Sequence, residues 1–196
     1  TPSLANSFAT KLMTGNGSSQ TINTGFKPDF IWQKFRNITY SNQLMDSVRS
    51  NFTELLQSDT TASQNTNTGV IASTSNTGFT TGASGIVTSN GQPMVFWNWK
   101  AGGTPAINTD GTTGNNGNVT AAVTSIVSAN QAAGFSIAEF IAPIADGGIG
   151  YGAPNYGHGL AGTPDLVIFK RADGTSSWMV FSNGNGLGAR KRLELN

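Results

Sequence analysis

The sequence predicts an all-β protein, an antiparallel β-sandwich of the jelly-roll, lectin-like or laminin-G-like kind, followed by a partial second module. Three observations support this fold class. Short runs rich in Val, Ile, Phe and Trp alternate with turns, and Gly accounts for 25 of 196 residues. Only 11% of the residues are charged, so polarity comes from 24 Thr and 20 Asn. A Pro-Asp strand also occurs twice, once in each half of the chain.

The charge and composition argue against several classes of partner. The net charge is +1, and the basic residues are scattered apart from Arg190, Lys191 and Arg192, which is weak support for a nucleic-acid partner. No run of eighteen apolar residues is present, so we expect no membrane span. The first residue is Thr1, from which we expect a fragment or a processed product. The low charge with abundant Thr, Asn and Gly is common in extracellular and virion surface proteins.

The repeated strand sets the expected domain organisation. Pro28 and Pro164 lie 136 positions apart, and each begins a Pro-Asp turn, an apolar run and a basic exit. This spacing indicates modules of domain size and not a solenoid. We expect a first β-sandwich module at residues 1–103, a Gly/Thr/Asn-rich linker at 104–118, and the start of an incomplete second module at 119–196.

The first strands follow from apolar runs bounded by turn residues. Residues 6–14 are an expected strand, and the Gly-rich segment 15–19 ends it. A short strand at 20–24 precedes the bend at Pro28. In residues 29–36 the apolar side chains fall on both faces, which predicts a central strand covered on each side.

The rest of the first module reads as short strands around a polar loop at 57–68. Expected strands lie at 39–48, 69–72, 78–81, 86–88 and 93–100, and residues 52–56 fit either a strand or a helical turn. Asn90-Gly91 predicts a hairpin between the last two. Residues 93–100 alternate, so Trp97 and Trp99 share one face. Two indoles on one face can stack a sugar, but packing is the favoured interpretation.

The second module repeats several of these elements. Residues 119–128 are strand-like, 133–140 restart the pattern of 6–13, 178–181 take the place of 43–46, and 193–195 echo 55–56. Nothing in it corresponds to residues 60–100. A half-sandwich leaves strand edges and apolar faces uncovered. We therefore expect its sheet to be completed by the first module, by a neighbouring chain, or by sequence absent here.

Candidate catalytic and metal-binding residues are few. The chain has no Cys and a single His, so thiolate and multi-histidine metal sites are excluded. His158 lies in a Gly-flanked loop and is interpreted as a solvated or turn-capping residue. Asp46 and Arg49 are interpreted as a structural ion pair, because the second copy lacks them.

Two further groups carry only weak signals. The loop Asp110–Asn118 is oxygen-rich but has one carboxylate, so any calcium affinity should be weak. A glycan-cleaving enzyme would need two carboxylates across a cleft, for which Asp29, Asp46, Glu54 and Glu139 are candidates by default. The sequence thus assigns no catalytic, cofactor-binding or metal-binding residue, and it leaves glycan-binding residues open.

A set of motifs resembles a module of virion structural proteins from marine tailed phages. The motifs are TGNGSSQTI at 14–22, GFKPDFIW at 25–32, YSNQLMDSVR at 40–49, VFWNWKAGG at 95–103, AGFSI at 133–137, GHGL at 157–160 and WMVF at 178–181. The chain is similar to tail-fibre and other surface-exposed virion proteins in which such modules recur in tandem. The resemblance implies a sandwich of the lectin or laminin-G type, and it carries no catalytic residue.

The leading hypothesis is therefore a phage virion structural protein on the particle surface, most simply a tail-fibre or appendage component with host glycans as candidate ligands. A capsid decoration or cement protein is the alternative, and a glycan-cleaving enzyme is the third. The expected partners are other virion proteins and further copies of this chain, a trimer being one candidate state. No cofactor, nucleic acid or membrane is expected.

Overall fold

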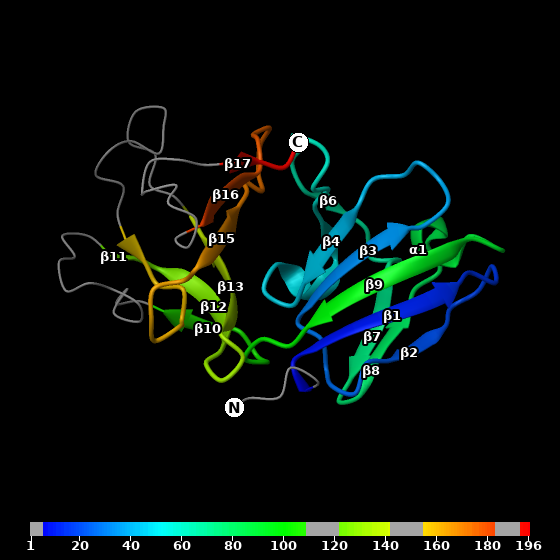
Figure 1. Ribbon diagram of the computed structural model, residues 1–196, viewed down its shortest axis with the longest axis horizontal. Coiled ribbons are helices and arrows are strands. Elements are labelled where there is room, and N and C mark those ends of the chain that lie inside the picture. Colours follow the sequence, from blue (N-terminus) through cyan, green and yellow to red (C-terminus); the bar gives the residue numbers. More distant parts are fainter. Residues whose placement is uncertain (1–5, 109–121, 142–154, 183–192) are drawn as a thin grey trace.

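A computed structural model describes residues 6–108, 122–141, 155–182 and 193–196, and these form an almost entirely β protein (Figure 1). The first unit contains β1 (Phe8–Thr14), β2 (Thr21–Asn23), β3 (Phe30–Phe35), β4 (Gln43–Asp46), η2 (Ser50–Phe52), β5 (Glu54–Leu55), β6 (Asn65–Thr66), β7 (Ile71–Ser75), β8 (Gly78–Thr81), α1 (Gly85–Thr88) and β9 (Pro93–Trp99). The second contains β10 (Ala106–Asn108), β11 (Ala122–Val123), β12 (Ser125–Asn130), β13 (Phe135–Phe140), β14 (Asn155–Tyr156), β15 (Leu166–Phe169), β16 (Met179–Ser182) and β17 (Leu193–Glu194).

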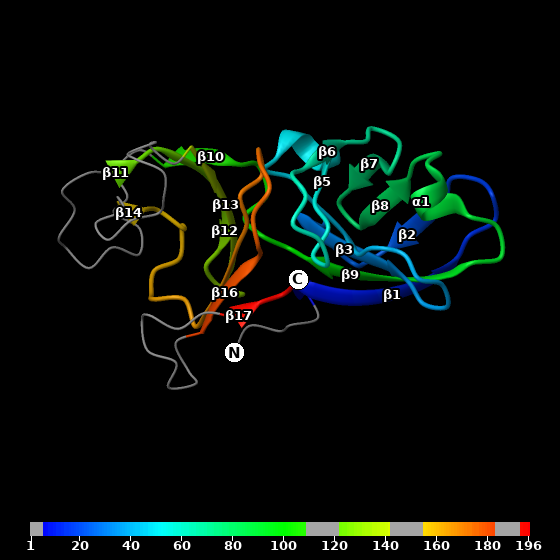
Figure 2. The ribbon, with the colours of Figure 1, turned by 90° about the horizontal axis from the view of Figure 1, so that it is seen from above.

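The first unit is a two-layer sandwich, which confirms the predicted fold class. One sheet has the strand order β1-β9-β3-β4 and the other the order β2-β8-β7, and every pairing in both is antiparallel. Seen from above, the two layers separate, with β1 and β9 on one side and β7 and β8 on the other (Figure 2). Phe79 and Phe96 meet between the layers, with ring centroids 5.5 Å apart.

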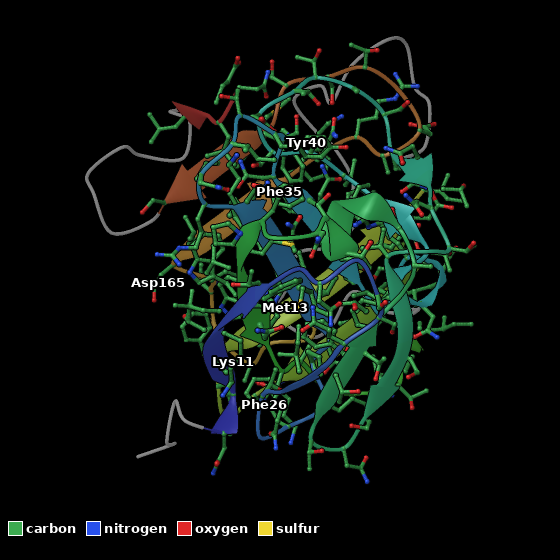
Figure 3. All side chains as sticks on the ribbon, turned by 90° about the vertical axis from the view of Figure 1, so that its right-hand side faces the viewer. Lys11, Met13, Phe26, Phe35, Tyr40 and Asp165 are labelled. Atoms are coloured by element: carbon green, nitrogen blue, oxygen red, sulfur yellow. The ribbon has the colours of Figure 1, made fainter. Side chains whose placement is uncertain are left out.

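The core between the sheets is apolar. Its buried residues are Ile22, Ile31, Phe35, Met45, Phe52, Leu55, Val70, Ile71, Phe79, Val87, Met94 and Phe96. They come from every layer element named above except β1, which contributes the partly buried Met13. Lys11 and Met13 follow one another along β1 in Figure 3, while Phe35 and Tyr40 lie near the other edge of this sheet.

The strand β3 is central, as expected, but it is not covered equally on its two faces. It pairs with β4 on one edge and β9 on the other. Its burial alternates: Ile31, Gln33 and Phe35 are buried, while the residues between them are only half-buried. The odd-numbered residues of β3 face the sandwich core, and on the other face Phe30 and Trp32 pack against the cluster that contains Trp178 of the second unit. The expectation of a central strand covered on each side is therefore confirmed for the inner face and in part for the outer one.

Residues 86–88 are helical and do not form the expected strand. Ser84 caps the short helix α1: its hydroxyl accepts from the Ile86 N–H at 3.4 Å, and its carbonyl accepts from the Thr88 N–H at 3.1 Å. Serine is a favoured N-cap because its oxygen satisfies one of the free N–H groups. Asn90-Gly91 therefore links a helix to β9 and not two strands.

The turn η2 holds three consecutive residues in left-handed backbone. Ser50, Asn51 and Phe52 have φ values of 47°, 50° and 68°. Left-handed geometry is unfavourable for L-residues by about 1–2 kcal/mol each. Burial of the Phe52 side chain, which is 2% exposed in the core, holds this turn in place.

The second unit has smaller sheets. The order β10-β12-β13 makes one, β15-β16-β17 makes another, and β11 pairs with β14 in parallel. Three residues of the expected linker, Ala106–Asn108, form β10 and pair with β12. Phe140 and Phe169 stack with ring centroids 5.8 Å apart, joining the two three-stranded sheets.

The register of strand pairing supports the internal repeat. In the β3–β4 hairpin Phe30 pairs with Asp46, and Gln33 pairs with Gln43. Adding 136 to each number gives Leu166 with Ser182 and Phe169 with Met179, which are the end pairs of the β15–β16 hairpin. The place of β4 is therefore taken by Met179–Ser182, one residue later than the expected 178–181.

The third strand of the repeat is also present. Leu44 bridges to Leu56 beside β4, and Val180 pairs with Leu193 in β17 beside β16. The expected echo of residues 55–56 at 193–195 thus occupies the corresponding place in the sheet. The pairs Gln33–Gln43 and Phe169–Met179 are each ten positions apart, so the two hairpins agree in register.

Candidate functional site

The most distinctive surface of the first unit is the side of the β1-β9-β3-β4 sheet that faces away from the core. We call it the outer aromatic face and define it by Phe8, Phe30, Trp32, Trp97 and Trp99. The register explains it, because Phe8 and Phe30 both pair with Trp99, and Trp32 pairs with Trp97. Side chains of directly paired residues lie on the same face. All five are half-buried.

The second unit covers one part of this face. Phe135 stacks on Trp99 with ring centroids 6.1 Å apart, and it lies 6.3 Å from Phe30. Trp178 is 5% exposed and packs with Leu44 and Leu56. Of the three expected ways to complete the half-sandwich, contact with the first module is therefore present.

Backbone hydrogen bonds hold the same junction. The Trp178 indole N–H donates to the Gln57 carbonyl at 2.7 Å. The Ser176 N–H donates to Thr61, and the Gln64 N–H donates to Ala172, at 3.0 and 2.8 Å. Residues 57–64 were expected to be a polar loop, and they serve here as an edge to which the second unit binds.

The rest of the outer aromatic face borders this contact: Trp32 packs against the cluster of Leu44, Leu56 and Trp178, and Trp97 beside it is half-buried among the described residues. Trp32 and Trp97 meet edge to face, with ring centroids 6.3 Å apart and an interplanar angle of 80°. The Trp32 indole N–H donates to the Asn42 side chain at 2.8 Å, and the Asn42 N–H donates to the Asp59 carboxylate at 3.2 Å. An aromatic pair bordered by oriented polar groups suits a ligand with both apolar and hydroxyl surfaces. Trp99 packs as predicted, whereas the Trp97 ring keeps an accessible side.

Asp29 has a structural position at the start of β3. It is 1% exposed, and its carboxylate accepts hydrogen bonds from the Ala101 and Gly103 N–H groups at 2.8 and 3.3 Å and from the Ser47 hydroxyl at 3.2 Å. Burial raises the pKa of Asp29, and these hydrogen bonds oppose the rise. The residue ties the segment after β9 to the turn before β3.

Asp46 and Arg49 form the predicted structural ion pair. The Arg49 Nε donates to Asp46 Oδ2 at 2.7 Å, and Asp46 Oδ1 accepts from the backbone N–H groups of Val48 and Arg49. Arg49 also donates to the Gln64 side chain at 3.2 Å. Both carboxylate oxygens of Asp46 are engaged in holding the turn after β4, so this residue is placed for structure.

The two remaining candidate carboxylates, Glu54 and Glu139, have different environments. Glu54 accepts a hydrogen bond from the Thr66 hydroxyl at 2.8 Å across the β5–β6 pair. Burial raises the pKa of Glu139, the negative charge of Asp46 raises it further, and Arg49 lowers it. The fold thus brings Glu139 of β13 into electrostatic range of the Asp46–Arg49 pair, a proximity that sequence spacing did not indicate.

The remaining candidates fit simple roles where the structure describes them. His158 caps its own loop, because its Nδ1 accepts from the Leu160 N–H at 3.1 Å. The oxygen-rich loop Asp110–Asn118 and the basic triplet Arg190–Arg192 lie outside the described residues.

Among the residues that are described, no cluster of three His, Asp or Glu side chains could hold a metal ion. Within the same part of the chain, no helix has the length and apolar character needed to cross a membrane.

Comparison with known proteins identifies a family for this chain, and no individual protein matches it. A family model described as Domain of unknown function (DUF7483) matches residues 3–196. The chain belongs to this family. The match spans both units and the segment between them. No curated protein and no solved structure matches the chain.

Sequence reasoning missed which of the aromatic residues the second unit covers. The alternation of residues 93–100 correctly placed Trp97 and Trp99 on one face. The same period of two, applied to residues 30–35, would have placed Phe30 and Trp32 beside them. The contacts of Phe135 and Trp178 join residues far apart in the chain, and no local pattern indicates them.

Proposed function

We propose that this chain is a structural component of a phage virion, a building block of a tail fibre or similar surface appendage, with no catalytic role. The observation that supports it best is the repeated three-stranded unit, β3–β4 with Leu56 and β15–β16–β17, in matching hairpin register. Tandem β-modules joined by direct contacts make extended, rigid rods, which is what an appendage requires.

Low charge and dense hydrogen bonding at the junction support the same proposal. The units meet through the stacked Phe135 and Trp99 rings and through backbone bonds, with polarity carried by uncharged side chains. The stability of such a contact depends little on salt concentration, because few exposed ion pairs take part.

The non-catalytic role is supported by Asp29 and Asp46, whose carboxylate oxygens accept structural hydrogen bonds.

The experiment that tests the structural role is localisation on intact particles. Antibodies raised against the full chain, detected by gold labelling in electron microscopy, are expected to mark a tail-associated appendage. Labelling of the capsid shell would favour the decoration or cement protein instead. Absence of the protein from purified, genome-filled particles would contradict both.

A second candidate function, host-glycan binding, is favoured by the part of the outer aromatic face around Trp97. Trp97 is half-buried and meets Trp32, whose indole N–H is bound by Asn42, and the exposed Asp59 beside them has a carboxylate that suits sugar hydroxyls. The ligand class proposed is a surface polysaccharide with an apolar sugar face.

A glycan array probed with the full chain tests this binding role. Trp97→Ala is expected to remove most of the signal, because aromatic contacts dominate such sites. Leu12→Ala is the matched control, since Leu12 is apolar and 65% exposed on the same side of the sheet. Equal loss in the two variants, or an array without signal, would contradict glycan binding at this face.

A further inference from the structure

Among the strands that the structure describes, β15 is an edge strand. It pairs with β16 on one side, and within the part of the chain that the structure describes no strand pairs with the other. Its side chains are apolar and exposed: Leu166 is 58%, Val167 39% and Ile168 45% exposed. A strand edge with apolar neighbours on both faces is a template for pairing with another strand.

The first unit shows what occupies the same edge of the repeat. The strand β3 corresponds to β15, and β9 covers the edge of β3 that lies opposite β4. The offset of 136 that relates the two hairpins places Leu166, Ile168 and Phe169 at the positions of Phe30, Trp32 and Gln33. A strand bound like β9 would therefore run antiparallel to β15, with its equivalent of Trp97 opposite Ile168.

The direction of the peptide groups can be assigned from the first unit. The Arg36 N–H donates to the Pro93 carbonyl, whereas the Asp29 carbonyl accepts from the Ser47 N–H; only at Asp29, just before β3, does the N–H of an odd-numbered residue reach β9, at Trp99. Even-numbered residues of β3 therefore direct their backbone groups toward β9, and odd-numbered residues direct theirs toward β4. By the same offset, the backbone groups of Ile168 face the open edge.

A second observation also supports a β9-like strand at the edge of β15. Asp29 receives the N–H groups of Ala101 and Gly103, which immediately follow β9. Asp165 holds the same position before β15, yet it is exposed and has no hydrogen bond or ion pair among the described residues. In Figure 3 its side chain projects at the edge of the molecule.

We propose that the open edge of β15 binds a β9-type strand: an extended segment with alternating apolar side chains, followed by a Gly-containing turn whose N–H groups bind Asp165. This is strand addition, in which main-chain hydrogen bonds supply affinity and the alternate side chains supply specificity. The partner is the strand of a further module of this kind, and the binding site comprises β15 and Asp165.

The test uses the full chain and a synthetic peptide with the sequence of residues 92–103, followed by fluorescence anisotropy. Saturable binding at one site per chain is expected. Methylating the peptide nitrogen of Trp97, which faces β3 in the first unit, should weaken binding about tenfold or more by removing a hydrogen bond and adding a clash. Methylating the nitrogen of Phe96, which faces the opposite edge, should leave affinity within about twofold.

Two protein variants locate the peptide. Ile168→Pro removes an edge-facing N–H without removing a bond to β16, and it is expected to abolish binding while the circular dichroism spectrum is retained. Asp165→Ala should weaken binding of the 92–103 peptide several-fold and leave a shorter 92–100 peptide unaffected, since only the longer peptide carries Ala101 and Gly103.

Three results would overturn the proposal. Binding that survives Ile168→Pro would mean that the peptide binds elsewhere, for example by exchanging with β9 in the first unit. Equal loss with the two methylated peptides would indicate nonspecific apolar capture. Self-association of the chain by pairing β15 with β15, abolished by Ile168→Pro, would assign the edge to a symmetric contact between two β15 strands instead of a β9-type strand.

Discussion

At the scale of single residues, Asp29 and Asp165 show how one sequence motif can serve different environments. Both precede an apolar strand, but Asp29 is buried with three hydrogen-bond donors while Asp165 is exposed. The motif reliably predicted the turn and the strand. It did not predict burial, because burial of Asp29 depends on residues 101–103, which only the fold brings near.

The pKa of Asp29 leads to a test of stability against pH. Since burial raises this pKa, the folded state binds more protons than the unfolded chain between about pH 3.9, the pKa of an unfolded Asp, and the raised value. The contribution of Asp29 to stability is therefore largest at low pH and falls as pH rises through that window. Asp29→Asn keeps an oxygen for the Ala101 and Gly103 N–H groups and should remove this fall.

Thermal unfolding at a series of pH values measures the effect. Burial raises the pKa of Glu139 as well, so part of the pH dependence should persist in Asp29→Asn. Combining Asp29→Asn with Glu139→Gln should flatten the profile further. A variant whose profile parallels that of the original chain would contradict the assignment to Asp29.

Gln33 offers a second residue-scale prediction. It is fully buried in β3, and its amide nitrogen and oxygen have no hydrogen-bond partner among the described residues. Gln33→Met has similar volume and no unsatisfied polar atom, so we expect stability to rise by about 1–2 kcal/mol. Denaturant unfolding checks this.

Gln43 provides the matched control because it lies directly opposite Gln33 and is equally buried. Its amide nitrogen donates to the Ser41 carbonyl at 3.1 Å. Gln43→Met loses that hydrogen bond and should gain less than Gln33→Met. The opposite ranking would show that Gln33 is satisfied in solution.

At the scale of elements, apolar runs predicted strands well and left-handed turns poorly. The strand at residues 93–99 alternates as its sequence indicated, with Met94, Phe96 and Asn98 buried. The turn η2 has no Gly, and only Asn51 is of a type that often adopts positive φ values, so the sequence does not predict three in a row. Tertiary packing of Phe52 overrides the local preference there.

Ser50→Gly tests the strain in this turn. Glycine adopts φ near 47° without a steric penalty, so we expect a gain of up to about 1 kcal/mol in the free energy of unfolding. Ser73→Gly, at an exposed position of β7, should instead destabilise by about 0.5–1 kcal/mol. Equal effects of the two changes in urea unfolding would argue against strain at Ser50.

At the scale of the whole molecule, the contact between the two units determines whether they unfold together. Trp178 anchors it by packing on Leu44 and Leu56 and by donating to the Gln57 carbonyl. The two units lie side by side (Figure 1), and both Phe135 of β13 and Trp178 contact the first one. Their unfolding should therefore be coupled.

Trp178→Ala is expected to reduce stability by about 3–5 kcal/mol and to split unfolding into two transitions. Trp178→Phe keeps a ring but loses the indole N–H, so it should reduce stability less and preserve one transition. Differential scanning calorimetry distinguishes these outcomes. A single unchanged transition in Trp178→Ala would mean that the junction contributes little.

The sequence by itself determined the fold class, the repeated hairpin, the Asp46–Arg49 pair and the alternation of β9, because each rests on neighbours in the chain or on a period of two. Only the tertiary structure decided which aromatic residues are covered, how Asp29 is buried, and which strand is at the edge of its sheet in the described part of the second unit. Those features join residues that are far apart along the chain, and pairing across such distances is set by packing of the whole molecule, not by local pattern.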